Sequence, residues 1–289
     1  MSSPFPKREG VMLAHPITTP KLSKLGQLFF AQPKLNGERC RVDWFRNYPV
    51  LISSYGNEFP CIPHINAAIS ALTKEYGPQV PWDGELYLHG MPREEIHSIV
   101  SRRQNPHPDA EKIQLHIFDH QDPNLFQYQR LVQVQEFIPS NHPIIKRVET
   151  SQCAPDLWLN YLSTYTDQGY EGIILRHTTA LYEDKRSPFL LKYKPSEKDH
   201  YRILDLQEAL DIHTKEPKNM VGAYIVCGDD LTPFKVGAGK VPHSLRTSQW
   251  EDRHHPINTP IGKLLEVKHE KLRTINKIPV SCVAIRVLY

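Results

Sequence analysis

Apolar and polar positions alternate in short runs through the first two thirds of the chain. Residues 114–118 alternate strictly, as in a strand with one buried face. Residues 65–76 instead carry apolar side chains at helical spacing, and residues 93–103 follow Pro92, which commonly opens a helix. Further strands are expected at residues 40–45, 50–52, 86–88, 173–175 and 189–193. This mixture predicts an α+β domain.

The pattern changes after Lys194-Pro195. From there on, short β-type runs are separated by turns rich in Gly, Pro and His. These runs are residues 201–206, 223–227, 234–236, 264–267 and 280–288. Several short strands at this spacing predict a small barrel or sandwich. We therefore expect one domain at 1–196, with a Pro- and Lys-rich lead-in over residues 1–30, and a second domain at 197–289.

The composition limits the classes of protein to which the chain can belong. The 289 residues carry a formal net charge of only +3, spread evenly, so any track for a polyanion must be local. The five cysteines lie far apart without a Cys-x-x-Cys pair, which suits a reducing cytosol better than a disulfide framework or a zinc site. No secretion signal and no apolar run of membrane-spanning length is apparent. We expect a cytoplasmic or otherwise intracellular protein that is not secreted and has no membrane partner.

The candidate chemistry begins at Gln32-Pro-Lys-Leu-Asn-Gly-Glu-Arg39. Lys34 becomes a nucleophile if neighbouring cations and partial desolvation favour its free amine. Arg39 belongs to the same motif, and Gly37 permits a tight turn that exposes the lysine. The alternative is a plain β-hairpin, because Asn-Gly is a strong hairpin signal.

Further chemical groups follow in order along the chain. Glu85 and Glu171 are carboxylates of the kind that bind Mg²⁺ in phosphoryl transfer, although either alone would suit a surface turn. Phe118 closes a strand, where a position in the core is the plain alternative to a role in binding. Lys192 and Lys194 point to the same face of a strand, and two solvated lysines on an edge strand are the alternative.

Together these motifs resemble the covalent nucleotidyltransferases, and within them the ATP-dependent DNA ligases of minimal, phage-like size. The resemblance runs from about Gln32 to the C-terminus. It implies an adenylation domain with ATP-grasp-like antiparallel sheets and helices, followed by a small β-barrel of the OB fold. It also implies ATP as substrate, Mg²⁺, nicked double-stranded DNA as partner, and a monomer.

The resemblance assigns roles to named residues. Lys34 would be the nucleophile and Glu85 and Glu171 the metal-side carboxylates. The other residues given a catalytic role are Arg39, Lys192 and Lys194. The residues expected to bind the nucleotide are Gln32, Pro33, Lys34, Asn36, Arg39, Glu85, Phe118, Glu171, Lys192, Lys194 and, more weakly, Arg286. Arg176 is a further cationic candidate.

The C-terminal third carries its own matches. Val236-Gly-Ala-Gly239 resembles the Val-Gly-x-Gly turn in the OB fold of DNA ligases, and Ile261-Gly-Lys263 and Glu266-Val-Lys268 also match that domain. Capping enzymes and RNA ligases share the catalytic motifs but generally not this C-terminal pattern.

The chain also departs from the family at three places. Asn36 stands where most members have Asp, so this position loses a charge. Ser53-Ser-Tyr-Gly56 stands where many have Ser-Arg-x-Gly. The C-terminal motif, which usually carries several cations that orient pyrophosphate, offers only Arg286.

Three alternatives remain beside the DNA-ligase hypothesis. An RNA ligase or a capping guanylyltransferase would use the same lysine chemistry, and a non-catalytic nucleic-acid-binding module could keep the barrel alone. The intact set of Lys34, Glu85, Glu171 and the lysine pair argues against the last of these. ATP rather than NAD is the expected donor, because the lead-in is too short for an extra nicotinamide-binding domain.

Overall fold

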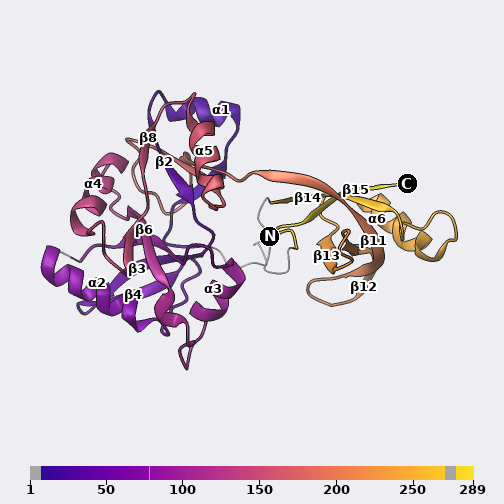
Figure 1. The fold of residues 1–289 in the computed structure, drawn as a ribbon, viewed down its shortest axis with the longest axis horizontal. Helices are drawn as coiled ribbons and strands as arrows, with labels where there is room; N and C mark the ends of the chain where they lie inside the picture. The colour runs from indigo at the N-terminus through magenta and orange to yellow at the C-terminus, as the bar shows by residue number, and fades with distance from the viewer. Residues whose placement is uncertain (1–7, 78, 271–277) are drawn as a thin grey trace. The chain divides into compact units, whose positions relative to one another are not determined.

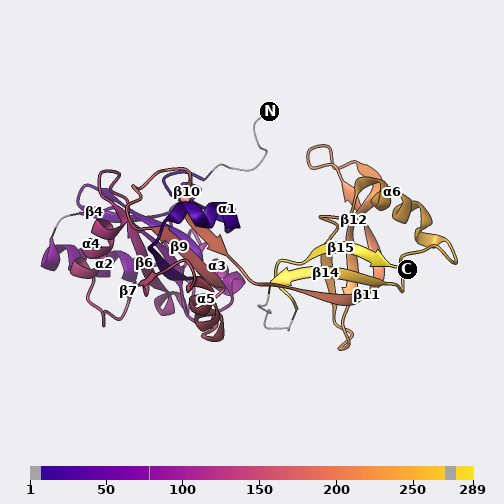
Figure 2. The same ribbon diagram turned by 90° about the horizontal axis from the view of Figure 1, so that it is seen from above.

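The computed structural model describes residues 8–77, 79–270 and 278–289. The chain divides into two compact units, Met1–Lys194 and Pro195–Tyr289, each with its own hydrophobic core (Figures 1 and 2). The division falls two residues before the boundary expected from the sequence. The architecture is α+β, as predicted.

The first sheet of the N-terminal unit carries the segment that ends in Lys34. Its strand order is β1-β10-β9-β2-β8. The bounds are β1 (Leu13–Pro16), β10 (Arg186–Tyr193), β9 (Gly172–His177), β2 (Phe29–Lys34) and β8 (Ser151–Cys153). Four of the five residues before Lys34 in β2 are apolar and all five are buried, which suits a strand with neighbours on both sides.

The second sheet lies in the same unit and has the order β4-β3-β5-β6-β7. Its strands are β4 (Tyr48–Ser53), β3 (Glu38–Phe45), β5 (Trp82–Tyr87), β6 (Gln114–His120) and β7 (Ile145–Arg147). The burial of β6 alternates as its sequence predicts. The chain passes from the first sheet to the second between Lys34 and Glu38, so the nucleophile motif lies at the junction of the two sheets.

Neither sheet is wholly antiparallel, so the expected antiparallel arrangement is too simple. In each sheet one edge pair is parallel, namely β1 with β10 and β6 with β7. The remaining pairs in both sheets are antiparallel. Parallel partners are joined by long connections, which hydrophobic periodicity alone does not reveal.

Helices pack on these sheets. In the first unit α2 (Pro63–Tyr76) and α4 (Gln127–Phe137) lie beside the second sheet, and α5 (Trp158–Asp167) lies beside β2 and β9 of the first (Figure 1). The remaining helices of this unit are α1 (Thr19–Leu22) and α3 (Arg93–Val100), with short 3-10 turns at Ser23–Leu25 and Ala110–Lys112. Among the described helices, none is long and apolar enough to cross a membrane.

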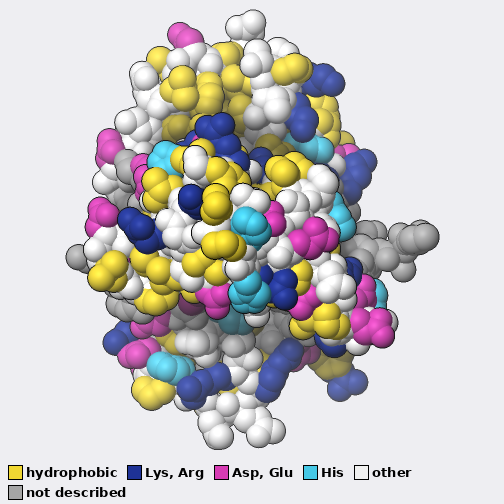
Figure 3. Space-filling view, turned by 90° about the vertical axis from the view of Figure 1, so that its right-hand side faces the viewer, with side chains coloured by type: hydrophobic (Ala, Val, Ile, Leu, Met, Phe, Trp, Pro, Cys, Tyr) yellow, Lys and Arg dark blue, Asp and Glu magenta, His cyan; other side chains and the backbone are white. Residues whose placement is uncertain are grey.

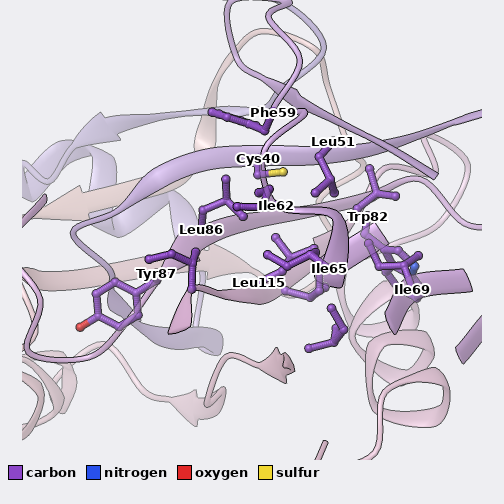
Figure 4. Packing of buried hydrophobic residues seen from close by; sticks show 14 of the residues in the cluster. Cys40, Leu51, Phe59, Ile62, Ile65, Ile69, Trp82, Leu86, Tyr87 and Leu115 are labelled. Atoms are coloured by element: carbon purple, nitrogen blue, oxygen red, sulfur yellow. The ribbon is translucent and has the colours of Figure 1, made fainter. Parts of the chain in front are cut away.

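The largest core lies between the second sheet and its helices. Ile62, Ile65 and Ile69 of the α2 region pack against Leu86 and Leu115 of β5 and β6 (Figure 4). Full burial of such a side chain contributes about 1.5–3 kcal/mol relative to exposure. This core fixes β3 and β5, the strands from which Arg39 and Glu85 project.

The C-terminal unit is a closed barrel in the order β11-β12-β13-β15-β14. Its strands are β11 (Ser196–Leu210), β12 (Pro217–Cys227), β13 (Pro233–Gly237), β15 (Val283–Leu288) and β14 (Leu264–Glu270). Helix α6 (His243–Glu251) packs on β12 and is followed by a 3-10 turn, Asp252–His254. Closure removes free strand edges, and the interior is filled by residues such as Val226, Val236 and Leu265.

Several predicted bounds are corrected. Of the predicted lead-in over residues 1–30, the described part, residues 8–30, is more than a lead-in, because β1 joins the first sheet and Val11 and Met12 are almost fully buried. The helix predicted at 93–103 ends at Val100. The strand predicted at 86–88 is the end of β5, and the last strand begins at Val283 rather than at residue 280.

The cysteines are all outside disulfides, as expected. Four are buried and Cys282 is partly exposed. Burial, with the nearby charge of Asp83, raises the pKa of Cys40 well above the usual range, and burial raises the pKa of Cys153 to about 11. Thiolate chemistry is therefore suppressed in the interior of the N-terminal unit.

Candidate active site

Lys34 is the last residue of β2 and lies opposite Gly172 of β9. The Glu171 N–H donates to the Lys34 carbonyl over 3.0 Å. The Lys34 Nζ is ion-paired with the Glu171 carboxylate, and the side chain is 18% exposed. The strand register thus places a reachable amine directly beside a buried carboxylate.

Glu171 holds two lysines at once. One carboxylate oxygen pairs with Lys34 and the other with Lys194, while the Glu171 side chain is only 3% exposed. Burial, followed by the charges of Lys34 and Lys194, lowers the pKa of Lys192. Two lysines therefore share one carboxylate, and Lys192 adds a third positive charge that acts on both. This leaves a local excess of positive charge suited to phosphate.

Glu85 supplies a second carboxylate from β5. Its Oε1 accepts the Gly37 N–H over 3.0 Å. Burial raises the pKa of Glu85, against the opposing effects of Lys34, Arg39 and the Gly37 N–H. Because Glu171 also raises this pKa, the two carboxylates act on one another electrostatically in the same site.

The Asn36-Gly37 step is not a hairpin turn, because β2 and β3 belong to different sheets. A Cβ at Gly37 would collide with the Leu86 carbonyl oxygen, and it would stand 2.9 Å from the Glu85 Cγ. Gly37 is therefore required for close approach to β5 rather than for the tight turn expected from the sequence. The half-buried Asn36 lies in this crossing.

Arg39 is fixed by a forked ion pair. Its Nε donates to Asp83 over 2.6 Å, and its Nη2 donates to the same carboxylate and to the Met12 carbonyl. Burial alone would lower the pKa of Arg39, but Asp83 outweighs this and raises it. Asp83 also accepts the Tyr182 hydroxyl over 2.7 Å. Glu85 was predicted from the sequence as a site residue, whereas its neighbour Asp83 and Tyr182 were not.

Phe118 has two guanidinium groups close to its ring. The Arg39 Cζ is 4.7 Å from the ring centroid and the Arg176 Cζ is 5.1 Å away. Gln32 is 2% exposed. Its amide nitrogen donates to the Phe118 carbonyl and to Thr150, and its oxygen accepts from Arg176. Both the nitrogen and the oxygen of the Gln32 amide are thus hydrogen-bonded within the protein, and they hold the Phe118 backbone and the Arg176 side chain in place.

Pro33 and Arg286 complete the predicted set. Pro33 is buried in β2 opposite Ile173. Arg286 belongs to the barrel unit, where its Nε donates to Glu266 over 2.6 Å and its side chain is 68% exposed. Within the barrel, Gly239 packs so closely on Val283 that an added Cβ would lie 2.7 Å from its Cγ1.

A buried ionic cluster lies next to Phe118, and the sequence did not indicate that its members would pair. Asp119, next to Phe118, pairs with Arg130 and Arg176, each at 2.8 Å, and the three side chains are at most 5% exposed. Burial opposes ionisation of Asp119, but Arg176 and Arg130 outweigh it and lower its pKa. The cluster ties α4 to both sheets, since Arg130 lies on α4, Asp119 on β6 and Arg176 on β9.

We predict that Asp119→Ala destabilises the N-terminal unit by roughly 3–5 kcal/mol, because it leaves two buried guanidinium groups without their carboxylate. Urea unfolding followed by circular dichroism measures this loss. The exposed Asp156→Ala variant is the control and should change the free energy of unfolding by less than about 0.5 kcal/mol. Equal stability of the two variants would contradict a structural role for the cluster.

Comparison with known proteins identifies the class. Residues 11–194 match the family model described as "ATP dependent DNA ligase domain", which covers most of the chain. The chain therefore belongs to the ATP-dependent DNA ligase family. It is similar to the DNA ligase of Haemophilus influenzae, with 25% identity over 198 residues, 68% of this chain and 67% of the relative.

Solved structures show the same fold. A Lig E DNA ligase, studied for DNA binding with a minimal scaffold, superposes with a TM-score of 0.73 at 22% identity, covering 96% of this chain and 99% of that one. The Chlorella virus DNA ligase–adenylate superposes with a TM-score of 0.54 at 19% identity, covering 99% of both chains. The predicted resemblance to minimal, phage-like DNA ligases is confirmed, and the RNA-ligase and capping alternatives are not favoured.

Proposed function

We propose that this ligase seals nicks in double-stranded DNA through an AMP adduct on Lys34. The observation that carries the proposal is the position of Lys34, paired with Glu171 at the junction of two sheets, with Lys192, Lys194 and Glu85 around it. This arrangement combines a nucleophile, a nearby proton acceptor and cations for phosphate.

The reaction has three transfers. The Lys34 Nζ forms a bond to the α-phosphorus of ATP as the bond to pyrophosphate breaks, and lysyl-AMP results. An oxygen of the nick 5′-phosphate then takes AMP from the lysine, and the 3′-hydroxyl finally displaces AMP to join the strand. Because Lys34 attacks as a free amine, its ammonium proton must first leave, and Glu171 is the hydrogen-bonded acceptor. Arg39, Lys192 and Lys194 stabilise charge on the phosphates, and Phe118 stacks on the adenine.

The carboxylates of Glu85 and Glu171 are suitable ligands for Mg²⁺. Glu85 and Glu171 bring two hard carboxylates into one site. Among the residues that the structure describes, no group of three or more His, Cys, Asp or Glu side chains is suited to a metal. Mg²⁺ commonly binds one or two carboxylates together with substrate phosphates. When bound, Mg²⁺ neutralises charge that develops on the phosphates.

The two units would have different roles in the reaction. We assign adenylation to residues 1–196 and an OB-fold role in DNA binding to residues 197–289, with the enzyme acting as a cytoplasmic monomer. The closed five-stranded barrel and its Val236-Gly-Ala-Gly239 turn support the OB assignment. On the face in Figure 3, Lys and Arg side chains are interspersed with acidic ones. Contacts to DNA are therefore expected to come from local groups of cations.

The proposal is tested by incubating the protein with labelled ATP and Mg²⁺ and resolving it by denaturing electrophoresis. A covalent AMP label on the protein is expected, with labelled GTP giving none. Nicked DNA should then be sealed, with a nicked RNA duplex as control. Labelling by GTP would favour a capping enzyme, and faster sealing of RNA would favour an RNA ligase.

We predict that a variant ending at Lys198 still reacts with ATP but loses most of its affinity for a nick. The variant keeps every candidate catalytic residue of the N-terminal unit, whereas the barrel is removed. The lost contacts would be mainly to phosphates, so binding of the intact protein should weaken steeply as salt rises.

A gel shift on nicked and intact duplexes across a salt series measures this effect. The intact protein is the reference, and circular dichroism of the variant establishes that it is folded. Equal nick affinity of the two proteins would remove DNA binding from residues 199–289.

A further inference from the structure

The segment just before β1 is firmly attached to the N-terminal unit. The Glu9 N–H donates to the Ser54 carbonyl and the Val11 N–H to the Asp184 carboxylate, both over 2.9 Å. The Met12 N–H donates to the Tyr182 hydroxyl over 3.1 Å. Val11 and Met12 are 1% and 2% exposed. The backbone next to Arg8 therefore has a fixed position.

Arg8 projects from this segment onto the loop after β4. Its Cζ lies 5.4 Å from the centroid of the Tyr55 ring, and its Nε donates to the Tyr55 hydroxyl over 3.3 Å. Tyr55 belongs to Ser53-Ser-Tyr-Gly56, in which Ser54 stands where many ligases have arginine. An arginine from a different part of the chain thus lies on the same loop.

The segment that carries Arg8 also contacts the candidate active site, because the Arg39 Nη2 donates to the Met12 carbonyl over 3.3 Å. The pKa of Lys192 is lowered by burial and then by Lys34, Lys194, Arg186 and Arg8. Among the described residues, neither Arg8, Arg186 nor Lys192 forms an ion pair with a carboxylate. Glu171 pairs with Lys34 and Lys194, but the charges of Lys192, Arg186 and Arg8 have no such partner in the described part of the chain.

We propose that Arg8 binds a substrate phosphate next to the one that Lys34 attacks, in place of the arginine absent from Ser53-Ser-Tyr-Gly56. This inference rests on the function proposed above. A guanidinium group presents several N–H donors in a fork that matches phosphate oxygens. The phosphate has two sources of the same chemistry, the pyrophosphate portion of ATP or the 5′-phosphate of the nick.

Three variants of the full-length protein test the proposal. Arg8→Ala removes the guanidinium, and Arg8→Lys keeps the charge but loses the fork. Arg46→Ala is the matched control, because the Arg46 Cζ likewise lies 5.2 Å from the ring centroid of an exposed aromatic residue, Phe45, and Arg46 is not among the groups that chiefly lower the pKa of Lys192. Thermal unfolding of each variant establishes that it is folded.

Measuring two rates shows whether Arg8 binds the pyrophosphate portion of ATP or the 5′-phosphate of the nick. The first is AMP labelling with ATP alone, and the second is sealing of a nick that already carries AMP on its 5′-phosphate. A charge-assisted hydrogen bond to phosphate predicts a loss of about 10- to 100-fold in one of these rates for Arg8→Ala. We expect partial recovery in Arg8→Lys and no change in Arg46→Ala.

The outcomes are distinct. A loss confined to labelling assigns Arg8 to the pyrophosphate portion of ATP, and a loss confined to sealing assigns it to the nick 5′-phosphate. Both rates within twofold of the wild type would overturn the proposal while leaving the ligase function intact. Absence of AMP labelling in the wild-type protein would instead overturn the proposed function, and the role of Arg8 with it.

Discussion

Lys34→Ala is expected to abolish formation of the AMP adduct, because Lys34 is the amine that the end of β2 places beside Glu171 as the nucleophile. Lys194 also contacts Glu171, but it is expected to bind phosphate rather than to attack it. Incubation with labelled ATP and Mg²⁺, followed by denaturing electrophoresis, measures the adduct. The variant should still seal a pre-adenylylated nick to some extent, since that step needs positioning rather than the amine.

Lys24→Ala is the control for this experiment, because Lys24 is an exposed lysine in the 3-10 turn that precedes β2. It should be labelled like the wild type. An acid-labile AMP adduct in Lys34→Ala would show that another residue is the nucleophile.

Glu171→Ala is expected to lower the rate of AMP labelling by roughly 10²-fold or more. The substitution leaves Lys34 and Lys194 without their shared carboxylate and removes both the proton acceptor and one metal-side group. Glu171→Gln keeps the shape but not the charge, so it should be nearly as slow. Single-turnover labelling across a Mg²⁺ series measures the effect.

Two comparisons sharpen this test. Glu85→Ala should also lose roughly 10²-fold or more in rate, and added Mg²⁺ should rescue at most one of the two variants in part. Glu183→Ala removes an ion pair with Lys185 and a hydrogen bond with Ser187, neither of which involves a candidate catalytic residue, so its rate of labelling should be unaffected. Normal labelling and sealing in Glu171→Ala would remove this residue from the site.

The strands were predictable where one face or both faces are buried by apolar side chains. Strands β3, β6 and β9 agree with their predicted positions to within a few residues. Helix α4 was not predicted, because the side that it buries includes Gln127 and Arg130 rather than a stripe of apolar residues. Its packing depends on the ion pair with Asp119, and an ion pair between distant segments leaves no periodic signal.

The candidate site was predictable where its residues form local motifs. Lys34, Arg39 and Glu85 could be named because each lies within a few residues of a diagnostic glycine. Tyr182 could not be named, since its role depends on Asp83, which is 99 residues away in sequence. Arg8 lay in a segment that its Pro- and Lys-rich composition suggested was a simple lead-in.

Because the five cysteines are buried to different extents, a thiol-reactive dye should label the native protein at one position. Cys282 is the partly exposed thiol, and it lies in the barrel unit, whereas Cys40, Cys61 and Cys153 are enclosed in the N-terminal unit and Cys227 in the barrel. A maleimide fluorophore should therefore react first at Cys282 without any engineered substitution. Energy transfer from this dye to a labelled nick would report when the barrel reaches the DNA, in real time and in the unmodified sequence.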